Sequence, residues 1–329
     1  MSQGACQKPE KRNSPPKRGA ANLFPTMLNL SILAALHEKY RESASLPVAD
    51  FALGPHRFDF QKQTYLMGVI NLSADSWYRE SVALNAEAAI RRGRVLHEQG
   101  AAIIDIGAES SLAHAALVDG KAQQRVLVPV VRDLAAAGLC VSVETYQPEV
   151  TTACLKAGAR ILNLTGTAQA EDIFREVADF GAGAIICFIQ GANVREVGDL
   201  DLGRDPAGAL YDFFARQIET ATNAGVSRLW IDPGLGFYYR NLQDSAERIR
   251  HQMRIFLNSF RLRSLGWPVC QALPHAFECF EDEVRVAEPF FAVLALLGQA
   301  SLLRTHEIAK ARGVLRTLEL IRDAKDVSI

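Results

Sequence analysis

Cysteine is scarce in this chain: six residues in 329, with no two of them forming a CxxC pair. The sequence therefore lacks the spacing of structural zinc sites and of thioredoxin-like redox motifs. Cys140, Cys187 and Cys270 lie inside apolar runs, where free cysteine is usually buried. We expect reduced thiols and a cytoplasmic protein, because disulfide-stapled proteins belong to oxidising compartments.

A strong charge of one sign is also missing, since the formal net charge is -1. Broad electrostatic attraction to nucleic acid or to an anionic membrane is therefore not expected. No apolar stretch reaches the ~18 residues that a membrane-spanning helix needs. Hydrophobic residues make up 49% of the chain and charged residues 22%, which supports a large buried core. A small-molecule ligand fits this composition better than a polyanion.

The chain falls into three segments by composition. Residues 1–22 are rich in Lys, Arg, Pro and Ser, so we expect a disordered basic tail. Residues 23–50 are expected to form a helical extension, because the apolar residues from Leu28 to Leu36 follow a helical spacing. Residues 51–329 have the pattern of one large domain.

The large domain alternates short apolar runs with long amphipathic stretches. Continuous Ile, Leu and Val runs are typical of strands buried on both faces, and helical crossovers between them imply parallel pairing. Eight such units predict a (β/α)8 TIM barrel. The eight runs are YLMGVIN (65–71), AAIIDIG (101–107), LCVSVET (139–145), ARILNL (159–164), GAIICFI (183–189), RLWIDPG (228–234), PVCQAL (268–273) and ASLLRTH (300–306). Helices are predicted at Ala86–Gln99, Ala122–Ala136, Pro206–Ala224 and Asp244–Leu265.

Polar residues stand near the carboxyl end of nearly every run. They are Asn71, Asp105, Glu144, Asn163, Asp232, Gln271, Arg304 and His306. In a barrel these ends meet on one face, which carries the chemistry. Any single residue could instead end a strand or cap a helix, but caps alone would favour Ser and Thr.

The chemistry of these side chains suits a flat heterocycle. Glu144, Asn163 and Asp232 offer carboxylate and amide groups that can bind an amino-pyrimidine edge through paired N–H bonds. Arg304 and His306 alternate on the last strand and could meet an anion at the barrel mouth. The amide oxygen of Asn71 could bind Mg2+, which usually keeps most of its waters.

At these positions the sequence resembles the dihydropteroate synthase family, over about residues 53–320. The resemblance rests on six motifs in order. MGVINLSADSW (67–77) is similar to the family's MGILN followed by TPDSF, IIDIGAESS (103–111) to its GxEST strand and turn, VSVETYQPEV (141–150) to SVDTxxPEV, ILNLTG (161–166) to IINDI, IDPGLGF (231–237) to LDPGxGF, and RTHE (304–307) to RxHD.

This resemblance implies a pterin-binding TIM barrel that condenses 6-hydroxymethyl-7,8-dihydropterin diphosphate with p-aminobenzoate or a related arylamine, releasing diphosphate. Asn71 would face the Mg2+–diphosphate, and Glu144, Asn163 and Asp232 would hold the pterin. Arg304 and His306 would engage anionic groups of the substrate. The family's dimeric habit, together with the apolar stretch 289–303, makes a homodimer the expected assembly.

Three departures from the family pattern bear on catalysis. His275 stands where the family's SRKS segment has its lysine, and Ala276 replaces the following serine. Glu144 replaces the aspartate of SVDT, and the stretch 111–120 lacks an arginine. His275 could recover part of the lost interaction when protonated, or it could be a surface loop residue. We therefore expect a transferase whose usual lysine and loop arginine are missing.

Two other functions remain open on the sequence. The chain could be a pterin-binding homologue or partner subunit without catalysis, which would bind pterin but release no diphosphate. It could also be another pterin- or folate-using transferase on the same barrel, such as a methyl-transfer enzyme, which would need no diphosphate site. A requirement for Mg2+ separates that last possibility from the first.

Overall fold

The computed structural model describes residues 28–73, 82–83, 85–110, 115–237, 239–242 and 244–323. The predicted tail at residues 1–22 lies outside the described residues and stays a prediction. Tertiary contacts divide the chain into two units between Tyr40 and Arg41. The first unit contains helix α1, Leu30–Lys39, within the predicted helical extension. Asn29 begins this helix, because its side-chain oxygen accepts the N–H of Ile32 at 3.1 Å.

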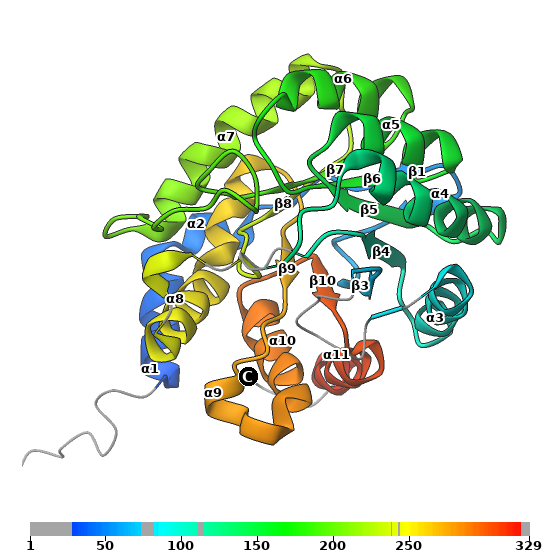
Figure 1. Cartoon of the computed structure of the whole chain (residues 1–329). Coiled ribbons are helices and arrows are strands. Elements are labelled where there is room, and N and C mark those ends of the chain that lie inside the picture. The colour runs from blue at the N-terminus through cyan, green and yellow to red at the C-terminus, as the bar shows by residue number, and fades with distance from the viewer. Residues whose placement is uncertain are drawn as a thin grey trace, which may run out of the picture. The chain divides into compact units, whose positions relative to one another are not determined.

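The second unit is the predicted barrel, with eight parallel strands in the order β8-β7-β6-β5-β4-β3-β10-β9 (Figure 1). A parallel bridge between Ile231 and Val269 joins the two ends of this sheet and closes the ring. The strands are β3 (Tyr65–Asn71), β4 (Ile103–Gly107), β5 (Val141–Thr145), β6 (Ile161–Leu164), β7 (Gly183–Cys187), β8 (Leu229–Asp232), β9 (Cys270–Ala272) and β10 (Leu302–Thr305). Each of the eight predicted runs contains one of them.

Helices follow the strands and surround the barrel, as Figure 1 shows. They are α3 (Ala86–Glu98), α4 (Gly120–Ala136), α5 (Pro148–Ala157), α6 (Ala170–Asp179), α7 (Pro206–Asn223), α8 (Ser245–Asn258), α9 (Phe277–Phe280), α10 (Ala287–Leu297) and α11 (Ile308–Asp323). Short 3-10 helices are η2 (Arg240–Leu242), η3 (Ser259–Leu265) and η4 (Glu281–Val286). The predicted helix 244–265 is thus α8 continued by η3. No helix of the described part is both long and apolar enough to cross a membrane.

Strand alternation decides which side chains enter the barrel. Met67, Ile103, Cys140, Ile161 and Trp230 belong to the interior cluster, while their chain neighbours pack against the helices. Because side chains alternate along a strand, residues two positions further on also point inward. Near the carboxyl ends those inward positions become polar, and the site lies there.

The amino end of the barrel is covered by a hairpin that the sequence patterns did not reveal. Strands β1 (Phe51–Leu53) and β2 (His56–Phe58) pair antiparallel. The ring centroids of Phe51 and Phe58 lie 4.6 and 5.3 Å from that of Trp230, both edge-on. Helix α2 (Arg41–Ser45) precedes the hairpin, and the backbone N–H of Ala49 donates to the carbonyl of Gly266 at 2.8 Å.

Candidate functional site

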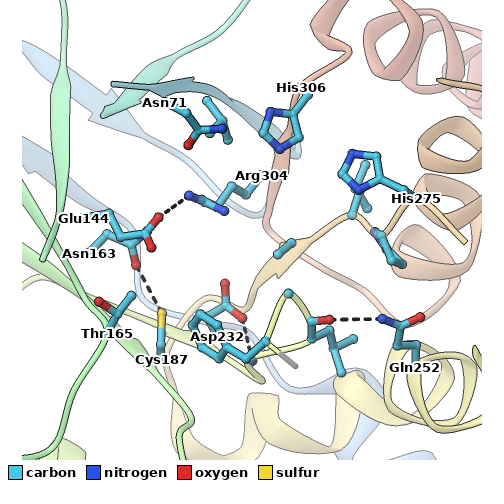
Figure 2. Close-up of a pocket in the computed structure, with 18 of the residues that line it drawn as sticks. Asn71, Glu144, Asn163, Thr165, Cys187, Asp232, Gln252, His275, Arg304 and His306 are labelled. Carbon is cyan, nitrogen blue, oxygen red and sulfur yellow. Dashed lines mark hydrogen bonds and ion pairs between the residues drawn. The ribbon is translucent and has the colours of Figure 1, made fainter. Parts of the chain in front are cut away.

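One pocket opens at the carboxyl end of the barrel, and the predicted residues line it. Its volume is about 1180 Å³ including the open mouth, which leaves ample room for a small ligand. The sequence-predicted residues that line it are Asn71, Glu144, Asn163, Asp232, His275, Arg304 and His306. Figure 2 shows their side chains around a common space. The predicted convergence of the strand ends is thus observed.

Arg304 stands at the centre of this pocket and is held by two carboxylates. Its Nε donates to Oδ2 of Asp105 at 2.8 Å, and its Nη2 forms an ion pair with Glu144 (Figure 2). Burial disfavours the charge of Arg304, but Glu144 and Asp105 outweigh it and raise the pKa of the guanidinium. Arg304 therefore stays charged at every pH of interest.

Asp105 lies beneath the pocket and connects several of its residues. It is fully buried, and Ser142 donates to its Oδ1 at 2.7 Å. Its Oδ2 accepts the side-chain N–H of Asn163 at 3.1 Å. The side-chain oxygen of Asn163 accepts the thiol of Cys187 at 3.1 Å, so both ends of the amide are fixed. Asp105 organises the layer that Glu144, Asn163 and Arg304 present to a ligand.

Asp232 faces the same space from β8 and is nearly fully buried. Its Oδ1 accepts the backbone N–H of Gly234 at 2.8 Å. Gly234 has a φ of +74°, and a Cβ there would lie 2.2 Å from the carbonyl oxygen of Phe188. The turn after β8 therefore requires glycine at this position.

Two carboxyl groups that line the pocket, Glu144 and Asp232, resist ionisation. Burial raises the pKa of Glu144 to about 7, although Arg304 opposes the shift. Burial also raises the pKa of Asp232 to about 6, against the hydrogen bond from Gly234 and the charge of Arg304. Carboxyl pKa values moved toward neutrality by burial in a pocket are typical of binding and catalytic sites.

The two histidines lie together on the wall of the pocket. The ring centroids of His275 and His306 are 5.4 Å apart, and Nε2 of His275 lies 3.2 Å from Oε1 of Glu288. Burial lowers the pKa of His306 well below its ordinary value, with further lowering by His275 and Arg304. His306 is therefore neutral at neutral pH. The adjacent Ala276 has a φ of +46°, an uncommon backbone state for a residue with a Cβ.

Comparisons with known proteins agree with this geometry. The family model described as pterin binding enzyme matches residues 67–269. The chain is 30% identical over 210 residues to dihydropteroate synthase of Mycobacterium leprae, covering 61% of this chain and 74% of that protein. It is 30% identical over 283 residues to the folate synthesis bifunctional protein of Arabidopsis thaliana. That match covers 78% of this chain but only 56% of the Arabidopsis protein. A structure of Xanthomonas albilineans dihydropteroate synthase with 4-aminobenzoic acid aligns at 26% identity and a TM-score of 0.70, covering 84% of this chain and 98% of that one.

The chain belongs to the dihydropteroate synthase family. Within the family's pattern, the structure brings His275 to the pocket, in the position that the motifs give to a lysine. It is not a surface loop residue, because its side chain is 13% exposed and faces Glu288. Glu144, which replaces the aspartate of SVDT, reaches Arg304 and forms the ion pair described above.

One expected member of the polar layer is absent from it. Gln271 neighbours Cys270, which belongs to the interior cluster, so Gln271 points outward toward the helices. It does not line the pocket. Both atoms of its side-chain amide are buried without a hydrogen-bond partner among the described residues, so Gln271 does not cap a helix there.

Several pocket residues were missed by the sequence patterns. These residues are Glu109 and Ser110 after β4, Thr165 after β6, Cys187 at the end of β7, and Arg248 and Gln252 on α8. Arg195, from the segment after β7, donates to the carbonyl of Ser110 at 2.7 Å and to that of Ala115. Arg195 thus holds both sides of the stretch 111–114, which itself lies outside the described residues. Glu109 lies within the motif IIDIGAESS (103–111), whereas Arg195 lies outside all six motifs.

Proposed function

We propose that this chain condenses 6-hydroxymethyl-7,8-dihydropterin diphosphate with p-aminobenzoate or a related arylamine, releasing diphosphate. In this reaction the bond from the pterin methylene carbon to the diphosphate oxygen breaks, a bond from that carbon to the arylamine nitrogen forms, and the amine loses a proton. The observation that carries the proposal is the layer of Glu144, Asn163, Asp232 and Arg304 around one pocket. The chain's place in the family supports the choice of substrates.

The inner layer suits the pterin ring. Asp232 and Glu144 can accept N–H groups of the amino-pyrimidine edge, and Asn163 is oriented beside them by Asp105. Three acidic side chains, Asp105, Glu144 and Asp232, lie close to the cation Arg304. Such a layer favours positive charge that develops on the ring as the leaving group departs. It disfavours a diphosphate, which would then lie at the rim.

The rim offers different chemistry. Asn71 and His306 line it, and Asn71 would bind Mg2+ through its amide oxygen. One neutral oxygen fits a hard cation that takes its other ligands from water and phosphate oxygens. Bound there, Mg2+ would neutralise charge on the departing diphosphate. His306, Arg304 and His275 would act as the remaining catalytic groups by orienting the anionic part of the substrate.

The proposal is tested by mixing the purified chain with the pterin diphosphate, p-aminobenzoate and Mg2+ and measuring diphosphate release. We expect release that needs all three additions and falls sharply in Asp232→Asn. The Xanthomonas albilineans enzyme was solved with 4-aminobenzoic acid, so that arylamine is the first to try. No release at saturating substrate would contradict the proposal.

A second candidate function is pterin binding without turnover. The replacement of the family lysine by His275 favours it, because a charge-assisted contact to the substrate would be lost at that position. Calorimetry separates the two functions. Tight pterin binding without diphosphate release would identify a binding subunit, whereas absence of pterin binding would rule out both.

We also propose a homodimer and a cytoplasmic location. Val286, Phe290 and Leu297 are 45%, 44% and 52% exposed and follow one another at helical spacing along α10 and the turn before it. An exposed apolar stripe of this kind is typical of a subunit interface. Light scattering of the wild type and of Phe290→Glu tests the assembly.

Cys140, Cys154, Cys187 and Cys270 are buried free thiols, which supports the proposed cytoplasmic location, because the cytoplasm is a reducing compartment.

A further inference from the structure

The pocket wall holds a second cluster of chemically active side chains. His275 follows β9, Glu288 lies in the first turn of α10, and His306 follows β10. One nitrogen of each histidine and one carboxylate oxygen of Glu288 all lie within 4.8 Å of one another. Glu288 is fully buried, whereas both histidines line the pocket. The cluster thus joins a buried charge to two imidazoles that a solute can reach.

Hydrogen bonds fix the orientation of Glu288. Its Oε2 accepts the hydroxyl of Thr305 and the backbone N–H groups of His306 and Glu307, at 3.1 and 3.2 Å for the two amides. Its Oε1 faces Nε2 of His275 at 3.2 Å and, among the described residues, accepts a longer bond of 3.3 Å from the His306 amide. A carboxylate held in this way through one oxygen presents the other as a ligand, as supported metal ligands do.

The donor set and its spacing fit a transition metal. Zinc binds imidazole nitrogen and carboxylate oxygen at about 2.0–2.2 Å, so two ligands of a tetrahedral site are about 3.4 Å apart. The 3.2 Å between His275 and Glu288 matches that spacing, and a side-chain adjustment would bring His306 to it. Two imidazoles with one carboxylate favour zinc or a similar ion over Mg2+, which prefers oxygen ligands.

We propose that His275, Glu288 and His306 bind a zinc-like divalent ion with an open coordination position facing the pocket. The role of this ion rests on the proposed function: it would supply, to the diphosphate group, positive charge at the position where the family motif has a lysine. Metal binding itself does not depend on that function. The site would thus replace a missing ammonium group with a metal ion.

Two neighbouring cations reduce the affinity of this site for a metal ion. Arg304 and Arg92 both act electrostatically on His306 and would oppose a bound cation. Asp105 and Glu144 neutralise Arg304, and the buried carboxylate of Glu288 offsets part of the remaining charge. Arg92 lies close by and donates to the carbonyl of His306 at 3.4 Å. Because its positive charge would repel a bound cation, we expect removal of Arg92 to strengthen metal binding rather than to abolish it.

The test uses the full chain without a histidine tag, freed of metal by a chelator and titrated with Zn2+ in excess Mg2+. We expect one ion per chain, and cobalt substitution should give the visible spectrum of a tetrahedral site. His275→Ala should weaken binding by at least the roughly 10- to 100-fold seen when a supporting residue of a metal site is lost. His37→Ala, which removes an exposed histidine of α1, should leave zinc binding unchanged.

The outcomes separate the two proposals. No zinc binding, or equal binding by wild type and His275→Ala, would overturn the site and leave only the 3.2 Å contact between His275 and Glu288. If His275→Ala fails to fold, the metal site is tested with His306→Gln, which should bind zinc more weakly than the wild type. The cobalt spectrum of the wild type then shows whether the site is tetrahedral. Inorganic diphosphate should bind more tightly to the zinc-loaded chain than to the chain with Mg2+ alone, and equal affinities would overturn the anion role. Zinc binding without pterin binding would defeat the proposed function while leaving the metal site standing.

Discussion

Arg304, at the end of β10, donates its Nε–H to Oδ2 of Asp105 on β4 at 2.8 Å, across the intervening strand β3. The bond joins the fully buried floor of the pocket to the side chain at its centre. Glu144 holds the same guanidinium from β5. The ion pairs of Arg304 therefore connect strands β4, β5 and β10 and also set the charge at the centre of the pocket.

Replacing Arg304 by alanine should destabilise the chain. The change leaves Asp105 buried without its cation, and breaking a buried pair in this way costs about 3–5 kcal/mol. Urea denaturation of the wild type and variant measures the difference. Arg304→Met combined with Asp105→Asn and Glu144→Gln should recover most of the loss, because both carboxylates that pair with Arg304 are then neutral.

A surface pair supplies the matched control for that experiment. Arg175 pairs with Glu171 and Asp172 on α6, and all three side chains are more than half exposed. Arg175→Ala should therefore cost less than about 1 kcal/mol. Equal losses for Arg175→Ala and Arg304→Ala would show that the pocket pair contributes nothing beyond an exposed one.

Asp232→Asn should have the opposite effect on stability while weakening pterin binding. The pKa of Asp232 is raised from 3.8 to about 6, mainly by burial, so its ionised form disfavours folding at neutral pH. At about 1.4 kcal/mol per unit of pKa, removing that charge gives roughly 3 kcal/mol of added stability. The backbone N–H of Gly234 can still donate to the amide oxygen.

This gain in stability should depend on pH. Because the folded pKa lies above the unfolded value, the gain should be full above pH 6 and should vanish as the pH falls toward 4. Thermal melting of both proteins across this range measures it. A gain that stays constant with pH would mean that folding does not raise the pKa of Asp232.

Much of this arrangement could be predicted from the sequence. The eight apolar runs fixed the strands, and the barrel then required Glu144, Asn163, Asp232 and Arg304 to meet at one end. Gln271 was the error. It lies in PVCQAL, a run that is apolar on both sides, and such a run does not indicate which residues face inward.

The supporting residues could not be predicted from local patterns. Asp105 was recognised as a strand-end residue, but its bonds to Arg304 and Asn163 join strands far apart in the sequence. Glu288 precedes an apolar stretch that is typical of a core helix, and only the packing of α10 against β10 brings its carboxylate to Thr305 and His306. Arg195 reaches Ser110 from a loop without a distinctive motif.

Pterin binding should weaken as the pH falls from 8 to 5. The pKa values of Glu144 and Asp232 are raised to about 7 and 6, so both groups gain protons in this range. A protonated carboxyl group has lost acceptor capacity toward the N–H groups of a pterin. Calorimetric titration with a pterin should show the largest change between pH 7 and 6. In Asp232→Asn the part of the profile near pH 6 should disappear, whereas a flat wild-type profile would contradict a contact with either carboxylate.

His275→Lys tests whether the pocket is a weakened synthase site. In Mg2+ alone the wild type has no permanent cation at position 275, and one charge-assisted hydrogen bond is worth about 1.5–3 kcal/mol. If the lysine reaches the substrate, kcat/KM should rise roughly 10- to 150-fold over that of the zinc-free wild type. His275→Ala, which lacks any donor, is the control and should not rise. Zinc should no longer affect the lysine variant, because the cluster has lost a ligand. If the variant gains nothing, a lysine at position 275 does not contact the substrate. The pocket wall formed by Glu288 and His306 would then be adapted to a histidine at that position.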